Sequence, residues 1–313
     1  MGTGPIPLLE AYKNGSDQWV PGIVETIVAD QAVLQHLPVE SVSGRTLKRE
    51  VEGSLPVTEY RNVNEDFSYS FGTDDERVFG LAILGNKFAA DTYNVDQAAD
   101  PGVLLAKAVR RQAKSMGMRL AYDIVNGTGT AKDFAGLRAM QQAGIIRSHN
   151  PTAAVVTLPN LDDALDKFEG DPPNIILANK RHRRQITNAC KGEAYTRLSW
   201  ERDNYGRRTT HYNDIPIVEA GNGQDALGAT AAILPFTENG TASSGSTTSS
   251  MYLLRFKDDE LTLLLGNGGK MGVQMWGPGE HGPSHGGRIQ WYVGLANWNI
   301  DAALRYSNIQ FGS

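Results

Sequence analysis

Residues 101–126 read PGVLLAKAVRRQAKSMGMRLAYDIVN, and their pattern predicts the clearest helix in the chain. Pro101 suits the first helical position, and the Asp100 carboxylate before it can cap the helix N-terminus. Apolar residues recur at spacings of three and four, which forms one stripe along a helix. The stripe consists of Leu105, Val109, Ala113, Met116, Leu120 and Ile124. Asn126 and the following glycine supply the stop, so the helix spans roughly 40 Å.

A second face of this helix is basic. Lys107, Arg110, Arg111 and Lys114 occur at i, i+3, i+4 and i+7, although the whole chain has a net charge of −5. An acidic chain carries no general field for nucleic acid. We therefore predict that these cations meet acidic side chains across a subunit contact rather than DNA.

The composition indicates a soluble globular protein. The chain has 313 residues, of which 40% are hydrophobic and 21% charged, enough for one large or two ordinary domains. The single cysteine, Cys190, excludes an internal disulfide and a cysteine-based zinc site, and is typical of a reducing cytoplasm. No apolar run reaches the ~20 residues that a membrane span needs, so no membrane partner is expected.

The segment before the helix predicts a long hairpin. Residues 46–96 are polar, rich in β-forming residues and broken by Gly53 and Pro56. The sequence GTDDER at 72–77 suggests the tip, which would place Asp74, Asp75 and Glu76 on the turn. A two-stranded ribbon is marginally stable alone, so this one must lie on something else. Like charges at a tip repel, so the tip should prefer a basic partner.

The second half of the chain alternates helices and strands. NIILA predicts a buried strand, and Asn179 can cap a helix over the basic run KRHRR that follows. IPIVEAG predicts an edge strand because it contains Pro216. MYLLRF and ELTLLL predict two paired strands. The last strand has period-two apolar residues, namely Ile289, Trp291, Val293 and Leu295.

No motif nominates catalytic, cofactor-binding or metal-binding residues. In YDIVNGTGTAKDF, Gly127 and Gly129 follow a helix and Lys132 precedes an aspartate, so the pattern predicts a turn rather than a phosphate loop. Glu280, His281 and His285 are loosely spaced among glycines, which favours a loop over a metal site. The basic run at 180–184 could touch phosphates, but a solvated or subunit-facing helix start is favoured.

Several segments, taken in order, resemble tailed-bacteriophage major capsid proteins. REVEGSLPVTEYRNVNE is similar to their R-E…L-P…R…N-E segment, and VNGTGTAKDFAGL to the N-G…F-x-G-L stretch after their long helix. IILANKRHRRQI resembles their strand followed by N-K-R…R-R. YNDIPIV resembles their Y-N-G-[IV]-P-[IV] strand, with Asp214 in place of glycine. MYLLRF and WYVGLANWNIDAALRYSNI resemble their closing strands.

The resemblance implies the α+β Johnson fold of the bacteriophage Hong Kong 97 capsid. That fold has an N-terminal arm, an extended E-loop hairpin, a peripheral domain with a long spine helix, and an axial domain of mixed sheet and helices. The corresponding ranges are 1–45 for the arm, 46–96 for the E-loop, 97–149 for the peripheral domain with its spine helix at 101–126, 150–285 for the axial domain, and 286–313 for closing strands returning to the peripheral domain.

The implied function is that of a major capsid protein without catalysis. Copies of the chain would assemble as pentamers and hexamers into the icosahedral shell of a virion, built in the host cytoplasm. Implied partners are a portal protein, packaged DNA bound without sequence specificity, and a decoration protein. Because the arm and E-loop occupy the roughly 100 residues before the spine helix, a scaffolding protein is expected to be separate.

The resemblance also places the E-loop over the peripheral domain of an adjacent subunit. This favours a contact of Asp74, Asp75 and Glu76 with the spine-helix cations Arg110, Arg111 and Lys114 of a neighbour. Arg61, the arginine of the matching E-loop segment, is a further interface candidate.

Three alternatives remain open from the sequence. The same fold could form an encapsulin-like nanocompartment whose cargo is an enzyme. A hydrolase or phosphate-binding enzyme would need a convergent polar pocket. A nucleic-acid-binding protein would use residues 180–184 and the spine helix.

Overall fold

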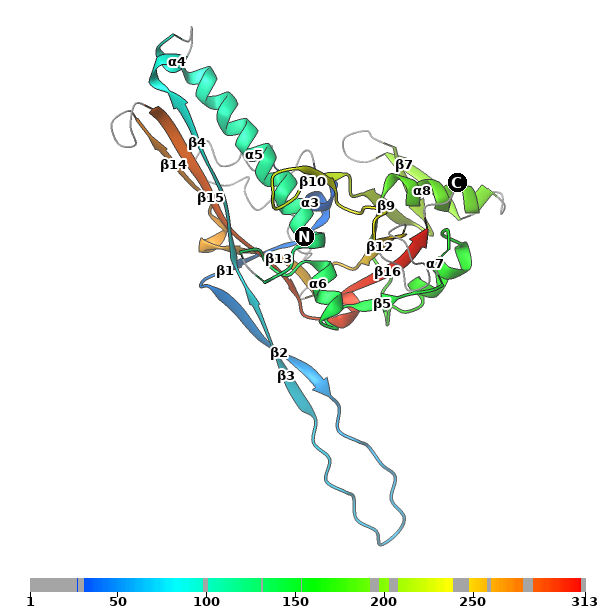
Figure 1. The fold of residues 1–313 in the computed structure, drawn as a ribbon. Helices are drawn as coiled ribbons and strands as arrows, with labels where there is room; N and C mark the ends of the chain where they lie inside the picture. Colours follow the sequence, from blue (N-terminus) through cyan, green and yellow to red (C-terminus); the bar gives the residue numbers. More distant parts are fainter. Residues whose placement is uncertain are drawn as a thin grey trace.

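The computed structural model describes residue 27 and residues 31–97, 101–130, 132–152, 154–191, 197–202, 208–238, 248–257, 260–277 and 284–310. Figure 1 shows a long helix lying along one sheet, a second sheet beside them, and a hairpin that projects away from the first sheet. The predicted α+β class is confirmed. Most of the predicted N-terminal arm, the Asp100 cap, Glu280 and His281 lie outside the described residues.

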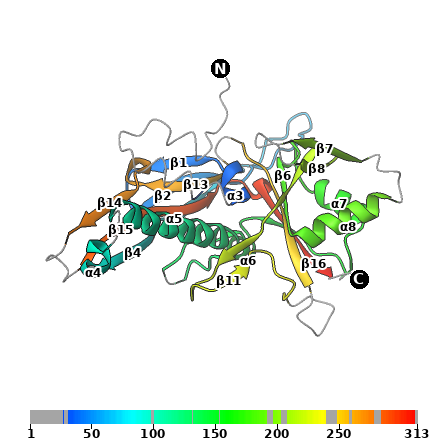
Figure 2. The same cartoon turned by 90° about the horizontal axis from the view of Figure 1, so that it is seen from above.

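The predicted spine helix is confirmed with its bounds, as α5 (Pro101–Asn126). Its apolar stripe is buried from Val109 to Ile124, and Leu105 at the outer end is half-buried. The stripe packs against a five-stranded sheet and shares one hydrophobic core with it (Figure 2). The strands of that sheet are β1 (Val39–Val42), β4 (Ala82–Asp91), β13 (Leu261–Gly266), β14 (Gly272–Trp276) and β15 (Ser284–Asn297).

Strand β15 organises the first sheet. It pairs antiparallel with β4 over ten residues on one side, and with β14 and then β13 on the other. Ile289, Trp291, Val293 and Leu295 are all buried, which confirms the period-two prediction. The residues between them face the opposite side of the sheet, because successive side chains of a strand alternate.

The projecting hairpin consists of β2 (Thr46–Ser54) and β3 (Thr73–Gly80). Its tip is not at residues 72–77 as predicted, because Asp74, Asp75 and Glu76 lie within β3 and pair with β2. The chain reverses instead at Asn62–Glu65, where Asn64 adopts a φ of 70°. Asparagine tolerates this left-handed conformation, and the two asparagines of RNVNE are the turn signal that charge pattern alone overlooked.

The second sheet has seven strands and separates two hydrophobic cores. Its order is β5 (Arg147–His149), β16 (Ala303–Gln310), β12 (Thr248–Leu254), β6 (Ile175–Ala178), β9 (Ile215–Glu219), β8 (Arg208–Tyr212) and β7 (Leu198–Arg202). Strand β6 is fully buried as predicted; Ile176 and Ala178 face one core, and Ile175 and Leu177 face the other.

Helices cover both faces of this sheet. Helices α7 (Leu158–Leu165) and α8 (Lys180–Lys191) pack on the smaller core, while α6 (Leu137–Gln142) packs on the core shared with α5. Asn179 caps α8 as predicted, since its side-chain oxygen accepts a bond of 3.2 Å from the Arg181 N–H. The short elements α3 (Ala32–His36), α4 (Thr92–Asp96), β10 (Asn222–Gln224), β11 (Thr230–Ala232), η1 (Asn267–Gly269) and η2 (Ile300–Ala302) complete the described part.

One prediction about strand pairing is wrong. MYLLRF and ELTLLL are not paired, because β12 lies in the second sheet and β13 in the first. Of the C-terminal strands, β15 joins the first sheet but β16 joins the second. The chain therefore passes between the sheets three times: between β4 and β5, between β12 and β13, and between β15 and β16.

Strand β9 lies inside the second sheet, between β6 and β8, although the sequence predicts an edge strand. Pro216 lies opposite His211, one position from a two-residue turn, so its nitrogen faces β6 rather than β8. Pairing with β6 begins only at Ile217, so the missing N–H disrupts no ladder bond. The turn residues Asn213 and Asp214 have φ of 46° and 64°, which shows that Asp214 fits the position.

Candidate subunit-interface surfaces

The outer part of the hairpin, residues 55–72, is extended but forms no strand ladder. Its two limbs are bridged by side chains instead: the Val57 N–H donates to the Ser70 hydroxyl at 2.7 Å, and the Ser68 N–H donates to the Glu59 carboxylate. Most backbone polar groups of this outer loop are consequently free of intrachain strand partners.

Large apolar side chains crowd this outer loop and are exposed. The exposed fractions are 74% for Leu55, 76% for Val57, 106% for Tyr60, 89% for Val63, 55% for Phe67, 94% for Tyr69 and 82% for Phe71. A soluble monomer rarely exposes so many apolar groups together, so such a concentration marks an interaction surface. Sequence reasoning missed these residues, although the alternation in FSYSF at 67–71 is a period-two apolar signal.

Arg61 holds the turn of the outer loop. Its guanidinium donates to the Glu65 carbonyl at 3.0 Å and lies 5.4 Å from the centre of the Phe67 ring. The Asn62 N–H donates to the Glu65 carboxylate at 2.9 Å, and this bond lowers the pKa of that carboxyl. Arg61 therefore has a role within its own chain, and its contact with a neighbour remains a prediction.

The stem of the hairpin, formed by β2 and β3, has two different faces. Leu47, Phe79 and Arg77 lie on a face that packs towards the sheet junction. Arg77 donates to the carbonyls of Asn297 and Trp298 at 3.2 and 3.0 Å. Phe79 meets the Trp298 ring edge-on at 4.9 Å between centroids. The stem is therefore anchored to the crossover between the two sheets.

The opposite face of the stem is acidic. Glu50 lies directly opposite Glu76, and Glu52 lies opposite Asp74. Asp75 alternates to the other face. Within the described residues, Glu76 forms an ion pair with Lys48, whereas Glu50, Glu52 and Asp74 form none. Asp74 and Glu76 thus share a surface with Glu50 and Glu52. The sequence did not predict this surface, because only the register of β2 and β3 brings the four residues together.

The basic residues of α5 are exposed, as predicted for a surface that meets an outside partner. They lie on the side of the helix away from the apolar stripe. Figure 1 places the hairpin beyond one end of the first sheet, so Asp74–Glu76 and α5 are not brought together within one chain. Whether copies bring them together stays a prediction.

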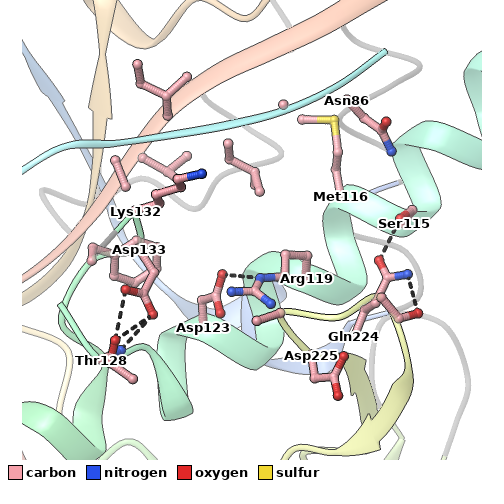
Figure 3. Close-up of a pocket in the computed structure, with 18 residues that line it drawn as sticks. Asn86, Ser115, Met116, Arg119, Asp123, Thr128, Lys132, Asp133, Gln224 and Asp225 are labelled. Atoms are coloured by element: carbon pink, nitrogen blue, oxygen red, sulfur yellow. Dashed lines mark hydrogen bonds and ion pairs between the residues drawn. The ribbon is translucent and has the colours of Figure 1, made fainter. Parts of the chain in front are cut away.

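A hollow beside α5 has a volume of about 640 Å³ and is lined by α5, β4, the turn after α5 and the β10–β11 loop (Figure 3). Arg119 donates to Asp123 at 2.7 Å, and Ser115 donates to Gln224 at 2.6 Å. Burial raises the pKa of Asp123 to about 6, against the opposing effect of Arg119. These groups are paired with one another, and none is arranged as a nucleophile with its base.

The glycine-rich stretch after α5 is a turn, as predicted. Gly129 has a φ of 69°, and the Thr128 N–H and hydroxyl both donate to the Asp133 carboxylate at 2.8 and 3.0 Å. Burial alone would raise the pKa of Asp133, but these hydrogen bonds bring it below its usual value. An internal carboxylate therefore takes the donors that a phosphate loop would offer to its ligand.

The basic run on α8 is partly used inside the chain. Arg183 pairs with Glu219 at 2.8 Å, and Arg181 lies 6.0 Å from the centre of the Phe236 ring. His182 is buried, which lowers its pKa to about 3 and keeps the imidazole neutral. Lys180 and Arg184 remain exposed.

Two classes of site are not seen in the described part of the chain. His285 lies at the start of β15, and the described residues contain no group of three or more metal-ligating side chains. None of the described helices is long and apolar enough to cross a membrane.

No protein-family model and no curated protein matches the sequence, but solved structures match the fold. An encapsulin complex, SrpI of Synechococcus elongatus PCC 7942, is 14% identical with a TM-score of 0.66, covering 90% of this chain and 88% of that one. The capsid of cyanophage A-1(L) is 14% identical with a TM-score of 0.58, covering 87% and 90%. The capsid of a native GTA particle is 12% identical with a TM-score of 0.57, covering 88% and 89%.

These matches extend over nearly the whole of each chain. The chain therefore has the Hong Kong 97-type capsid fold. At such identities the likeness concerns the fold alone.

Proposed function

We propose that this chain is a structural shell protein that assembles with copies of itself into a closed container. The observation that carries the proposal is the outer loop of the hairpin, whose seven large apolar side chains are exposed in the part of the chain that the structure describes. Repeated contacts of one chain with the next close into rings when the rotation between copies allows it, and rings tile a shell.

Burial of the loop against a neighbour supplies a driving force of the right size. An aromatic ring buries ~150–250 Å² in a contact, which corresponds to about 4–6 kcal/mol at ~25 cal/mol per Å². The ordering of the loop opposes part of this gain. Since the loop occurs in every copy, the remaining gain is repeated at every contact.

The test replaces Tyr69 and Phe71 by serine. We expect the Tyr69→Ser/Phe71→Ser variant to remain folded, because both rings are exposed in the chain. The protein concentration needed for assembly should rise by at least about a hundredfold. The matched control, Tyr69→Phe/Phe71→Tyr, keeps both rings and should assemble. Negative-stain microscopy and light scattering measure closed particles, and circular dichroism measures folding. Monodisperse wild-type monomers at high concentration would contradict the proposal.

The more specific form of the proposal is a major capsid protein whose pentamers and hexamers enclose phage DNA. The likeness to the cyanophage and GTA capsids supports this form. The capsid proposal includes four partners: a portal protein, a separate scaffolding protein, a decoration protein and DNA that is contacted without regard to its sequence.

An encapsulin-like nanocompartment is the second candidate, and the TM-score of 0.66 to the Synechococcus encapsulin favours it. The contents of particles purified from the native source separate the two. Nuclease-protected double-stranded DNA supports the capsid, whereas an enclosed protein without such DNA supports the nanocompartment.

A further inference from the structure

The face of the first sheet turned away from α5 carries a row of like positive charges. Lys87 on β4 lies directly opposite Arg288 on β15, and Arg288 lies opposite Gln274 on β14. Both cations are exposed, and neither forms an ion pair with a described residue. The Lys87 amine lies 5.1 Å from the centre of the Trp276 ring. We call Lys87, Arg288 and Gln274 the cationic row.

Small residues occupy four of the six cross-strand positions that flank the cationic row on this face. One flank holds Gly85, Gln290 and Gly272, and the other holds Ala89, Gly286 and the largely buried Trp276. A shallow hollow of about 250 Å³ reaches Arg288 and Gln274. A second β surface that approaches the two cations therefore meets mostly glycine and alanine, together with Gln290 and the largely buried Trp276 ring.

The acidic face of the hairpin stem has the complementary arrangement. We call Glu50, Glu52, Asp74 and Glu76 the carboxylate face; its two directly opposed pairs are both like-charged. Like charges opposite each other destabilise a sheet by roughly 0.2–1 kcal/mol per pair. The chain thus has opposed carboxylates on the hairpin stem and opposed cations on the first sheet, and both pairings are unfavourable.

One chain cannot bring these two surfaces together. Glu76 and Lys87 are separated by eleven positions of the almost continuous run β3–β4, which spans roughly 35 Å. Figure 1 shows the stem continuing away from the sheet in this direction. Any pairing between the surfaces must therefore join two copies.

We propose that the carboxylate face of one copy lies on the cationic row of a second copy. Lys48 already pairs with Glu76, so the carboxylates that the row would neutralise are Glu50, Glu52 and Asp74, which form no ion pair with a described residue. The inference rests on the proposed self-assembly and names the surfaces that meet in it. Two flat β surfaces stack face to face at about 10 Å, a distance that carboxylates and long cationic side chains bridge together.

This partner differs from the spine-helix cations that the charge pattern of the sequence suggests. On α5 the four basic residues are spaced by three and four positions along a helix, where a like-charged pair costs roughly 0.2–0.5 kcal/mol. On the sheet, Lys87 and Arg288 are directly opposed and present a flat target. A contact with Arg110 and Arg111 is the competing outcome of the test.

Carbodiimide crosslinking of wild-type shells tests the contact directly. The reagent joins a carboxylate to the Lys87 amine as an amide and takes up the released water as its urea. Mass spectrometry should identify peptides in which Lys87 is joined to Glu50, Glu52 or Asp74. The Lys87→Arg variant keeps the charge but lacks the reactive amine, so its shells should form without this crosslink. Closed wild-type shells that lack the crosslink, or crosslinks from these carboxylates to Lys107 or Lys114 instead, overturn the inference.

Charge reversal provides the second measurement. Glu50→Lys/Glu52→Lys and Lys87→Glu/Arg288→Glu should each raise the concentration needed for assembly by about tenfold, and their combination should return it to within about threefold of wild type. The control combines Glu50→Lys/Glu52→Lys with Arg110→Glu/Arg111→Glu and should show no recovery. Recovery only in this control overturns the inference but leaves the shell function intact. A wild-type chain that never forms shells overturns both.

Discussion

Replacing Trp298 by alanine should destabilise the chain and free the hairpin stem together. Trp298 lies in the crossover from β15 to β16 and is only 4% exposed. Its indole meets the Phe79 ring edge-on at 4.9 Å, and the Arg49 guanidinium lies 4.8 Å from its centre. Phe79 and Arg49 belong to the two strands of the stem, so one side chain connects both strands to the junction of the two sheets.

The expected loss follows from these contacts. Truncating a buried tryptophan to alanine costs about 3–5 kcal/mol, which includes the cavity that it leaves. The edge-to-face contact and the cation–π contact each contribute about 1 kcal/mol of this. Arg77 still binds the carbonyls of residues 297 and 298, so the stem should loosen rather than detach. We therefore expect a loss of about 4 kcal/mol in the free energy of unfolding.

Urea unfolding of the unassembled Tyr69→Ser/Phe71→Ser chain measures the first effect, with and without Trp298→Ala. Hydrogen exchange measures the second, as faster exchange of the amides in β2 and β3. Trp200→Ala is the matched control, because Trp200 is 43% exposed on the edge strand β7 and should cost less than about 1 kcal/mol. A loss below about 1 kcal/mol for Trp298→Ala, or unchanged exchange in the stem, would refute the role assigned to this side chain.

Two further predictions concern the end of α5. Burial raises the pKa of Asp123 to about 6, so between pH 4 and 6 the folded chain binds more protons than the unfolded one and its stability falls as the pH rises. Urea unfolding measures this effect. When the pH is lowered from 7 to 4, the free energy of unfolding of the wild type should rise by up to roughly 3 kcal/mol relative to that of Asp123→Asn. An unchanged difference between the two proteins would argue against a perturbed carboxyl. Gly127→Ala should lower the free energy of unfolding by at least about 2 kcal/mol, because a Cβ there would overlap the carbonyl oxygens of Phe134 and Asp123. Thermal unfolding measures this loss. Gly80→Ala is the control and should be nearly neutral, because a Cβ at Gly80 meets no atom within 4 Å.

Elements with a strong local signal were predicted well. The bounds of α5 follow from its 3.6-residue periodicity, its first proline and its terminal glycine, all of which act within a few residues. The burial of β6 and of alternate residues in β15 follows from apolar runs in the same way. The turn after α5 could be separated from a phosphate loop because it follows a helix rather than a strand.

Pairing between distant strands could not be predicted from such signals. Strands β12 and β13 are close in sequence, yet they lie in different sheets: β12 pairs with β6 and β16, whereas β13 pairs with β1 and β15. Pro216 signals an edge only when its nitrogen falls where a neighbouring strand is paired, and register decides that. The hairpin tip was predicted at residues 72–77 because charged residues indicate exposure. Exposure alone does not locate a turn, and the turn at Asn62–Glu65 depends instead on an asparagine in the left-handed conformation.

Two features of the hairpin depart from what stabilises an isolated chain, and assembly would account for both. Its outer loop alternates aromatic residues without a surface to bury them, and its stem places carboxylates opposite carboxylates. In an isolated chain both features are unfavourable, whereas natural sequences usually agree at every level of structure. A second copy of the chain would resolve both at once, because its surface can cover the rings and its cationic row can neutralise the carboxylates. If that is the reason they exist, variants that remove either feature should leave the monomer as stable or more stable while weakening the shell. A variant set in which the same changes destabilise the monomer would show instead that the hairpin serves the fold of its own chain.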